Sequence, residues 1–314
     1  MDLRVARRSS VVAIVNAAAG ACRRDPSLLR RLGEILPPGQ LQVTQNLDDL
    51  PPALSELRER EVDTVAIIGG DGSISGTLTA LVRSWPIEKL PRIGAIRGGT
   101  VNTIAGSLGA RAKPDVALQR IAAGDVEASR PRPILQVTAA GEEARYGMIF
   151  ANGAAARWLV AYYRGRTGAV GAAGLVTRTL TSIPFGGKLS REIFQPFKAE
   201  LDIDAQALHE ETSLIACSAV RHVGLGFAPF ESAGEHPDRF HCCWLTGSAT
   251  RLLRDMPLFA LGRFQESAVL QHRAPHSIRL SLSGAEPYTV DAELFPATAE
   301  VRVDVGPALS FLAA

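Results

Sequence analysis

Short apolar runs alternate with longer amphipathic stretches in the first part of the chain. Four runs rich in Val and Ile, each bounded by Gly, Pro or Asn, are typical of buried strands; they lie at residues 11–15, 41–44, 64–68 and 92–96. Their starts are 30, 23 and 28 residues apart, which leaves room for a crossover helix in each gap. The pattern predicts an α/β domain whose parallel sheet is covered on both faces.

The gaps between these runs carry helix signals. Asp25 and Pro26 suit an N-cap followed by a first-turn proline, which predicts a helix from there. A second helix is expected from near Asp49 and a third from near Ile74, and residues 104–108 and 114–123 predict two more.

The pattern changes at residues 124–133, a polar stretch with two prolines that predicts a domain boundary. We expect residues 1–130 to form a nucleotide-binding α/β domain. Residues 131–314 should form a second, β-rich domain whose last strand packs back on the first. Strand candidates in the second domain lie at residues 134–139, 144–150, 199–203, 212–220, 276–282, 288–294 and 299–305. With a turn at 283–286 and helical insertions near 158–163, 170–180 and 249–261, they predict a mainly antiparallel β-sandwich.

Composition and charge narrow the class of protein. Hydrophobic residues make up 46% of the 314 and the net charge is +2, which argues against disorder and against a nucleic-acid partner. The four cysteines, Cys22, Cys217, Cys242 and Cys243, show no zinc-ligand spacing and suit a reducing compartment. The run at 11–15 follows Arg4, Arg7 and Arg8 but is too short for the apolar core of a signal peptide. No apolar run is long enough to span a bilayer, so we expect a cytoplasmic protein.

A glycine-rich segment follows the predicted strand at 64–68 and precedes a predicted helix: Gly69, Gly70, Asp71, Gly72 and Ser73. Adjacent glycines let a bound group approach the backbone N–H groups, and the helix N-terminus adds partial positive charge. The segment therefore predicts a phosphate site in which Asp71 organises Mg²⁺ or a ribose hydroxyl. The alternative is a tight strand–helix turn with an N-capping Asp.

A similar segment follows the strand at 92–96: Gly98, Gly99, Thr100, Val101 and Asn102. Ligands bind at the carboxyl ends of strands in open α/β sheets, so two such loops in one sheet strengthen the prediction of a phosphate site.

A third candidate site is formed by Asp291, Ala292 and Glu293 at the end of a predicted strand. Two carboxylates at i and i+2 on one strand would point the same way and suit metal binding or general-base chemistry. The alternative there is a solvated acidic edge.

These three motifs, in this order, resemble the diacylglycerol kinase catalytic-domain family, which includes bacterial diacylglycerol and sphingosine-type lipid kinases. Gly69 to Ser73 is similar to the family's GGDGT loop, Gly99 to Asn102 to its GTxN loop, and Asp291 to Glu293 to its DGE motif. Asn16 follows the first predicted strand, where the family has an Asn-Pro turn. Thr44 ends the second predicted strand, where the family has a Thr that contacts the nucleotide. The glycine-rich residues 224–226 resemble a strand end that precedes a DG turn, where Asp238 is the nearest match. Departures include Ser75-Gly76 for Asn-Glu, Ala292 for Gly, and Arg239 for Gly.

The resemblance implies an ATP-dependent lipid kinase that uses Mg²⁺ and holds the nucleotide between its domains. It implies Glu293 as general base with Asp71 as a second catalytic residue, and metal contacts from Asp71, Asp291 and Asp238. The implied nucleotide contacts are Asn16, Thr44, Gly69, Gly70, Asp71, Gly72, Ser73, Ser75, Gly99, Thr100 and Asn102. The expected partner is a lipid substrate at a membrane surface, to which the protein would bind peripherally, and an exposed strand edge would favour a homodimer.

Two other functions remain open from the sequence. One is a kinase of a soluble hydroxyl substrate such as NAD, because GGDG also occurs in NAD kinases. The other is a non-catalytic nucleotide-binding regulatory module, which the departures from the family pattern favour.

Overall fold

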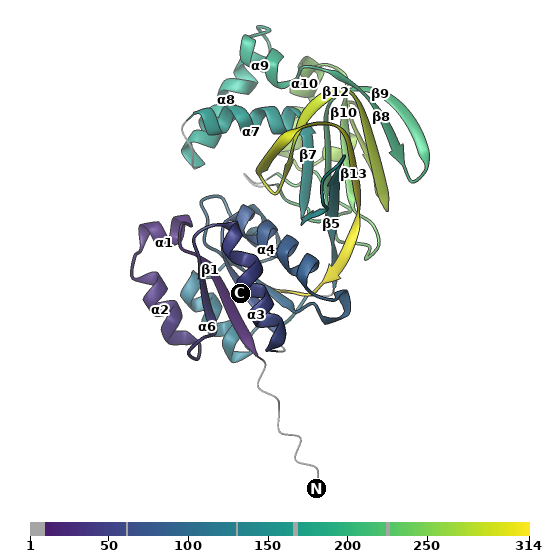
Figure 1. Cartoon of the computed structure of the whole chain (residues 1–314). Helices are drawn as coiled ribbons and strands as arrows, with labels where there is room; N and C mark the ends of the chain where they lie inside the picture. The colour runs from purple at the N-terminus through teal and green to yellow at the C-terminus, as the bar shows by residue number, and fades with distance from the viewer. Residues whose placement is uncertain (1–9, 61, 130, 166–168, 224–226) are drawn as a thin grey trace. The chain divides into compact units, whose positions relative to one another are not determined.

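The computed structural model describes residues 10–60, 62–129, 131–165, 169–223 and 227–314. The chain forms two compact units (Figure 1). The first contains the chain up to Pro131 together with Leu309–Ala314, and the second is Arg132–Ala308. Arg4, Arg7 and Arg8 and the glycine-rich residues 224–226 lie outside the described residues.

The first unit is built on a parallel sheet. Its five strands run in the order β14-β4-β3-β1-β2, and every pairing between neighbours is parallel. The strands are β1 (Val11–Asn16), β2 (Leu41–Thr44), β3 (Thr64–Gly69), β4 (Arg92–Arg97) and β14 (Phe311–Leu312). The four strands predicted in this half are confirmed, and the α/β class with them.

Helices connect these strands as expected: α2 (Leu28–Ile35), α3 (Leu50–Glu59), α4 (Asp71–Ser84), α5 (Thr103–Ser107) and α6 (Pro114–Ala123). The short helix α1 (Gly20–Arg24) and the 3-10 turns η1 (Leu47–Asp49) and η2 (Ile87–Lys89) were not predicted. Two predicted starts were wrong. The helix expected from Asp25 begins at Leu28, because the Asp25 carboxylate accepts hydrogen bonds from the backbone and side chain of Ser27 and forms a local turn. The helix expected from near Ile74 begins at Asp71, inside the glycine-rich segment.

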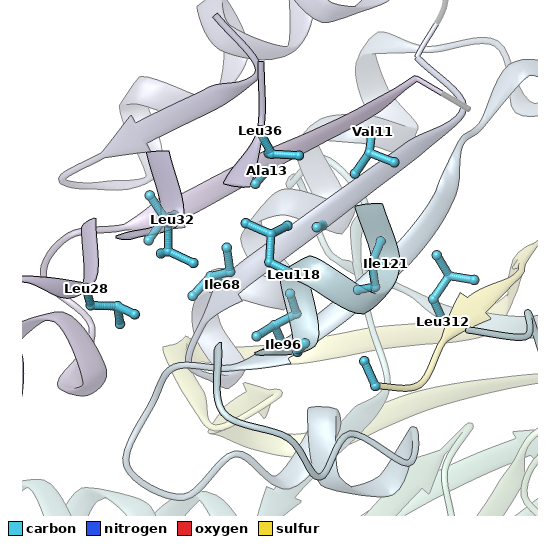
Figure 2. Packing of buried hydrophobic residues seen from close by; sticks show 14 of the residues in the cluster. Val11, Ala13, Leu28, Leu32, Leu36, Ile68, Ile96, Leu118, Ile121 and Leu312 are labelled. Atoms are coloured by element: carbon cyan, nitrogen blue, oxygen red, sulfur yellow. The ribbon is translucent and has the colours of Figure 1, made fainter. Parts of the chain in front are cut away.

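One face of this sheet is covered by α2 and α6 (Figure 2). Leu28 and Leu32 of α2 and Leu118 and Ile121 of α6 pack in one buried cluster with side chains of β1, β3 and β4. Leu312 of β14 belongs to the same cluster. Burying these side chains stabilises the unit by roughly 1.5–3 kcal/mol for each Leu or Ile. The strands β3 and β4, which precede the two glycine-rich segments, are therefore held in a well-packed core.

The end of the chain completes the first unit. Phe311 and Leu312 of β14 pair in parallel with Ile93 and Gly94 of β4. The carbonyl of Ala314 accepts hydrogen bonds from the backbone N–H groups of Arg111 and Ala112, at 2.7 and 3.2 Å. The second unit therefore ends at Ala308, and the final residues return to the first.

The second unit is rich in antiparallel strands, as predicted. They are β5 (Arg132–Ala139), β6 (Arg145–Gly147), β7 (Ile149–Gly153), β8 (Phe197–Ile203), β9 (Gln206–Ser218), β10 (His241–Thr246), β11 (Leu270–Arg273), β12 (Ser277–Val290) and β13 (Glu293–Leu309). In place of the two separate sheets of a sandwich, they form one nine-stranded sheet. The long strands β9 and β12 make this possible, because each pairs with β8 along one part and with β7 along another.

Three sequence-based boundaries in this unit were wrong, and β10 and β11 were not predicted. The strand expected at 288–294 crosses the turn between β12 and β13. The strand expected at 144–150 is divided between β6 and β7. The turn expected at 283–286 lies inside β12, where the register against β13 shifts between Ser281 and Glu286 in an irregular stretch that keeps the strand continuous. The chain reverses instead after Val290.

Helices lie outside this sheet, and the predicted insertions are confirmed: α7 (Ala154–Arg164), α8 (Ala169–Ser182) and α10 (Ala249–Ala260). α9 (Lys188–Ile193) and the 3-10 turn η3 (Phe264–Glu266) were not predicted. In the described part of the chain, no helix combines the length and apolar character needed to cross a bilayer.

Two buried histidines meet in the second unit. His241 Nε2 lies 2.9 Å from His272 Nδ1, and His241 Nδ1 lies 2.7 Å from Ser232 Oγ. Burial, together with the neighbouring His272, lowers the pKa of His241 to about 4, and burial also lowers the pKa of His272. Both imidazoles are therefore neutral in the folded protein near neutral pH.

We expect this pair to make the protein sensitive to acid. In the unfolded chain a histidine takes up a proton near pH 6.5, so the unfolded state binds more protons below that value and the free energy of unfolding falls as pH is lowered towards the folded pKa. Urea unfolding at several pH values should show this dependence of the free energy of unfolding on pH. The dependence should be weaker in His241→Phe and unchanged in His209→Gln, since His209 is exposed. An unchanged dependence in His241→Phe would contradict the assignment.

Candidate functional site

The two glycine-rich loops of the first unit meet backbone to backbone. Gly98 N–H donates to the carbonyl of Gly69 at 2.8 Å. A Cβ on Gly98 would lie 2.8 Å from Gly69 N, and a Cβ on Gly99 would lie 2.5 Å from Gly70 Cα. No side chain fits at such distances, so glycine is required for the loops after β3 and β4 to touch. Gly98, which was not among the predicted contacts, is therefore as important to the geometry as Gly99.

Asn102 holds the second loop in shape. Its backbone is left-handed, with φ 57°, a conformation that Asn tolerates better than most residues. Its side-chain Oδ1 accepts from Gly99 N–H at 2.7 Å, and its Nδ2 donates to Gly99 O at 3.0 Å. Because both polar atoms are used inside the loop, Asn102 positions Gly99.

Asp71, in the first glycine-rich loop, is hydrogen-bonded to the residues that follow the second loop. Its carboxylate accepts from the backbone N–H groups of Thr103 at 3.1 Å and Ile104 at 2.9 Å, at the start of α5. Burial raises the pKa of this carboxyl, opposed by those two N–H donors. The expected N-capping role is thus observed, but the capped helix is α5, not the helix that contains Asp71.

The N-terminus of α4 presents free backbone donors. The N-cap is Gly70, with no side-chain cap, and the first backbone bond of the helix runs from Ile74 N–H to Gly70 O at 3.1 Å. A Cβ on Gly72 would meet nothing within 4 Å, so the space beside this turn is open. Unpartnered N–H groups and the helix dipole together favour an anion, and the α4 N-terminus is a candidate phosphate cradle.

Polar side chains border a small pocket beside this cradle. Asn16 Nδ2 donates to Ser73 Oγ at 2.8 Å, which joins the end of β1 to the first turn of α4. Thr44, at the end of β2, donates through Oγ1 to Val15 O at 3.3 Å. Asn16, Thr44 and Ser73 line one pocket together with Asn46, Leu47 and Thr77, which the sequence did not single out.

Two other predicted nucleotide contacts, Thr100 and Ser75, differ in their exposure to solvent. Thr100 is exposed, and a Cβ on Gly20 would lie 3.3 Å from its Oγ1, which places α1 beside this loop. Ser75 is only 4% exposed. Ser75 therefore belongs to the packed side of α4, and its contact with a nucleotide stays a prediction.

In the second unit, Asp291 and Ala292 form the turn between β12 and β13. Both have positive φ, 50° and 66°, and Val290 pairs directly with Glu293. Successive left-handed residues are the geometry of a two-residue hairpin turn. The expectation that Asp291 and Glu293 point the same way from one strand was wrong, because the chain reverses between them.

The Asp291 side chain is committed to this turn. It is 2% exposed, and its carboxylate oxygens accept from the backbone N–H groups of Met148 and Ile149 at 2.8 to 3.0 Å. A Cβ on Gly147 would lie 2.4 Å from Asp291 Oδ2, so the neighbouring strand leaves room for the carboxylate only because residue 147 is glycine. Asp291 fixes the turn from which Glu293 emerges.

Glu293 is the first residue of β13 and is partly buried. Burial raises the pKa of its carboxyl, and the positive charge of Arg145 opposes that shift. Arg145 forms an ion pair with Glu142 at 2.8 Å, and its guanidinium lies 4.1 Å from the ring centroid of Phe295, two residues after Glu293. A carboxylate with a raised pKa is suited to accept a proton.

The three expected metal ligands make different contacts within their own units. Asp238 is exposed and lies 3.6 Å from His276 Nδ1, while Asp71 and Asp291 are hydrogen-bonded to backbone N–H groups. Among the described residues, no group of three or more His, Cys, Asp or Glu side chains could hold a metal ion. The metal contacts implied for Asp71, Asp291 and Asp238 therefore stay a prediction.

Comparison with known proteins agrees with this geometry. Residues 10–130 match the model of the diacylglycerol kinase catalytic domain, the segment that contains both glycine-rich loops. No curated protein matches the sequence.

Solved structures match over nearly the whole chain. A protein described as a candidate diacylglycerol kinase from Bacillus anthracis strain Sterne has a TM-score of 0.71 at 16% identity, covering 98% of this chain and 97% of its own. A diacylglycerol kinase structure from the same organism has a TM-score of 0.65 at 18% identity with the same coverage. At such identities the likeness establishes the two-unit fold. Residues 10–130 are thus similar to the diacylglycerol kinase catalytic domain, within a chain whose fold is that of these solved structures.

Proposed function

We propose that the protein is an ATP-dependent kinase that transfers the γ-phosphoryl group to the hydroxyl group of a lipid. The first unit would bind the nucleotide and the second would supply the base. The observation that carries the proposal is the pair of glycine loops in backbone contact at the uncapped N-terminus of α4. Such a turn presents donors to phosphate oxygens, and the matching family model describes a kinase domain.

The α4 N-terminus, with Gly70, Gly72 and Ser73, would hold the phosphates. Asn16 and Thr44 would line the adjoining part of the nucleotide site. Asp71 and Asn102 act through the loops that they hold rather than through direct contact with the reacting atoms. Phosphoryl transfer depends mainly on positioning and charge stabilisation, so loops held rigidly in contact are suited to it.

Glu293 would accept the proton of the acceptor hydroxyl. As that proton moves to the Glu293 carboxylate, the hydroxyl oxygen bonds to the γ-phosphorus, the bond from that phosphorus to the β–γ bridging oxygen breaks, and ADP leaves. Burial keeps the pKa of Glu293 above its ordinary value and so favours proton uptake, while Arg145 keeps it from rising further.

We further propose that Mg²⁺ binds with the nucleotide. Magnesium in kinases takes most of its ligands from phosphates and water and only one or two from carboxylates, so a preformed protein cage is not required. Asp71 is the carboxylate at the phosphate cradle. Each of its oxygens accepts one backbone hydrogen bond and keeps further acceptor capacity, so it would be the protein ligand. The ion would neutralise charge on the phosphates, and no other residue of the proposed site depends on it.

The direct test is transfer of labelled γ-phosphate to lipids in mixed micelles. The panel contains diacylglycerol, monoacylglycerol, a sphingoid base, ceramide and phosphatidylglycerol. Label extracted with one lipid would support the proposal and name the acceptor. Label in a water-soluble product when NAD or another soluble alcohol is supplied would favour the soluble-substrate kinase. ATP binding with no transfer to any acceptor would favour a regulatory nucleotide-binding module.

The charge of Arg145 should be visible in the pH dependence of the reaction. Arg145→Met keeps most of the stem that packs on Phe295 but removes the charge that lowers the pKa of Glu293. The base is then protonated up to a higher pH, so the acid limb of kcat/KM against pH should move to higher pH. Arg279→Met is the control, since Arg279 pairs with the exposed Glu300. An acid limb that stays in place in Arg145→Met would contradict the assignment of Glu293.

A further inference from the structure

Charge is unevenly distributed along the second unit. Between residues 154 and 196, which include α7, α8 and α9, the sequence has six basic residues and one acidic residue, whereas the whole chain has a net charge of only +2. Arg164, Arg178 and Arg191 are exposed, and Lys188 is 88% exposed. The three helices lie together, outside the sheet of the second unit (Figure 1). This helical group, residues 154–196, is therefore a strongly basic part of a nearly neutral protein.

The outer face of α8 has few polar groups. Val170, at its beginning, is 82% exposed, and Phe185, three residues after its end, is 88% exposed. Within α8 the exposed positions after Val170 are Ala173, Gly174, Thr177, Arg178 and Thr181, at the three- and four-residue spacing of one helix face. An exposed helix face normally carries several charged side chains; this one carries only Arg178.

The threonines of this face do not offer their hydroxyl groups to solvent. Thr177 Oγ1 donates to Ala173 O at 3.0 Å, and Thr181 Oγ1 donates to Thr177 O at 2.9 Å. This bond to the carbonyl one turn earlier satisfies the hydroxyl inside the helix and leaves the methyl group as the more apolar part of the side chain. The α8 face is thus more apolar than its sequence implies.

A groove beside α8 extends this surface. It has a volume of about 320 Å³ and is lined by Ala161, Tyr162 and Gly165 from the α7 side and by Val170, Gly174 and Leu175 of α8, with Arg178 also on its wall. Tyr162 stacks on Trp158 and contacts Tyr163, which is 52% exposed. Aromatic side chains with a polar end are favoured at the headgroup level of a bilayer.

We propose that the α8 face, defined by Val170, Ala173, Thr177, Thr181 and Phe185, docks on the surface of an anionic lipid bilayer. Its apolar side chains would enter the headgroup–acyl boundary, while the neighbouring Arg164, Arg178, Lys188 and Arg191 contact anionic headgroups. The basic charge decides the occupant, because a purely apolar face would fit a protein partner equally well. The proposal depends on the proposed function only in that a lipid acceptor gives the protein a reason to reach a bilayer.

The test is co-sedimentation of the full chain with vesicles, without ATP. We expect binding to vesicles of phosphatidylcholine mixed with phosphatidylglycerol, weak binding to phosphatidylcholine alone, and loss of binding as salt is raised. Val170→Asp with Phe185→Asp should lower the partition coefficient by about tenfold or more. The matched control is Ile87→Asp with Leu261→Asp, since these side chains are 61% and 70% exposed elsewhere. It should bind as the wild type does.

The inference is overturned if the wild type does not bind anionic vesicles, if the Val170 and Phe185 variant binds as well as the wild type, or if the control loses as much. Thermal unfolding of each variant confirms that it is folded. Because no turnover is measured, a protein that binds vesicles but phosphorylates no lipid would contradict the proposed function alone. A protein that phosphorylates lipid in micelles but ignores vesicles would contradict the docking face alone.

Discussion

Glu293→Gln is expected to lower phosphoryl transfer by about 10²- to 10⁴-fold, the usual contribution of a general base. The amide has nearly the same shape as the carboxylate but cannot take up the hydroxyl proton. Because Glu293 lies beside a turn held by Asp291, the backbone of β13 should be unaffected, and nucleotide affinity should remain within about twofold of the wild type, since the substitution leaves the nucleotide contacts in place.

The matched control for that loss is Glu300→Gln, a carboxylate on the same strand that is 53% exposed and pairs with Arg279 at 3.7 Å. It should retain full activity. Labelled-phosphate transfer gives the rate, and urea unfolding shows whether stability has changed. If Glu293→Gln transfers phosphate as fast as Glu300→Gln, Glu293 is not the base, whatever lipid is the acceptor.

Gly99→Ala should remove nucleotide binding and destabilise the first unit. The new Cβ would lie 2.5 Å from Gly70 Cα and 3.2 Å from Asn102 Oδ1, so the two glycine loops must separate. Since the obstructing atom is backbone, it cannot move aside as a side chain could. We expect a loss of about 2–3 kcal/mol in the free energy of unfolding, as for other overpacked sites, and nucleotide affinity lowered by about tenfold or more, because the phosphate donors no longer converge.

Gly106→Ala is the control for this substitution. Gly106 lies in α5, and a Cβ there would meet nothing within 4 Å. In a helix, Ala is favoured over Gly by up to about 1 kcal/mol, so this variant should be as stable as the wild type or slightly more stable. Urea unfolding gives the stability of each variant, and nucleotide titration gives its affinity. If Gly99→Ala and Gly106→Ala have the same stability and the same affinity, the contact between the loops is not required for either property.

The strands of the first unit could be predicted because a strand buried on both faces is a continuous apolar run in the sequence. Residues 65–68 are an unbroken apolar run, and Thr64–Gly69 is a strand buried at every position. The start of α4 was placed too late because glycine disfavours helix interiors, yet Asp71 and Gly72 are helical here. Their propensity is overridden by the close contact of the two loops, which depends on residues about thirty positions apart in the sequence.

The turn at Asp291 and Ala292 could not be predicted for a different reason. Hairpin turns with two left-handed residues usually contain Asn or Gly, and neither is present. The conformation is held by long-range hydrogen bonds from Met148 and Ile149 to the Asp291 carboxylate, which no local pattern reveals. Residues 283–286, which do contain Ser and Gly, were therefore taken for the turn. The family motif singled out Asp291 to Glu293, but the strand geometry inferred for them was wrong.

The return of the chain to the first unit affects the order in which the protein can fold during synthesis. β4 pairs with β14 on one side, and β14 consists of Phe311 and Leu312 at the far end of the sequence. Until those residues leave the ribosome, β4 is an unpaired edge strand with exposed backbone groups, a site where chains associate wrongly. The first unit is translated first but completes its sheet last. Its folding therefore has to wait for the whole of the second unit to be made.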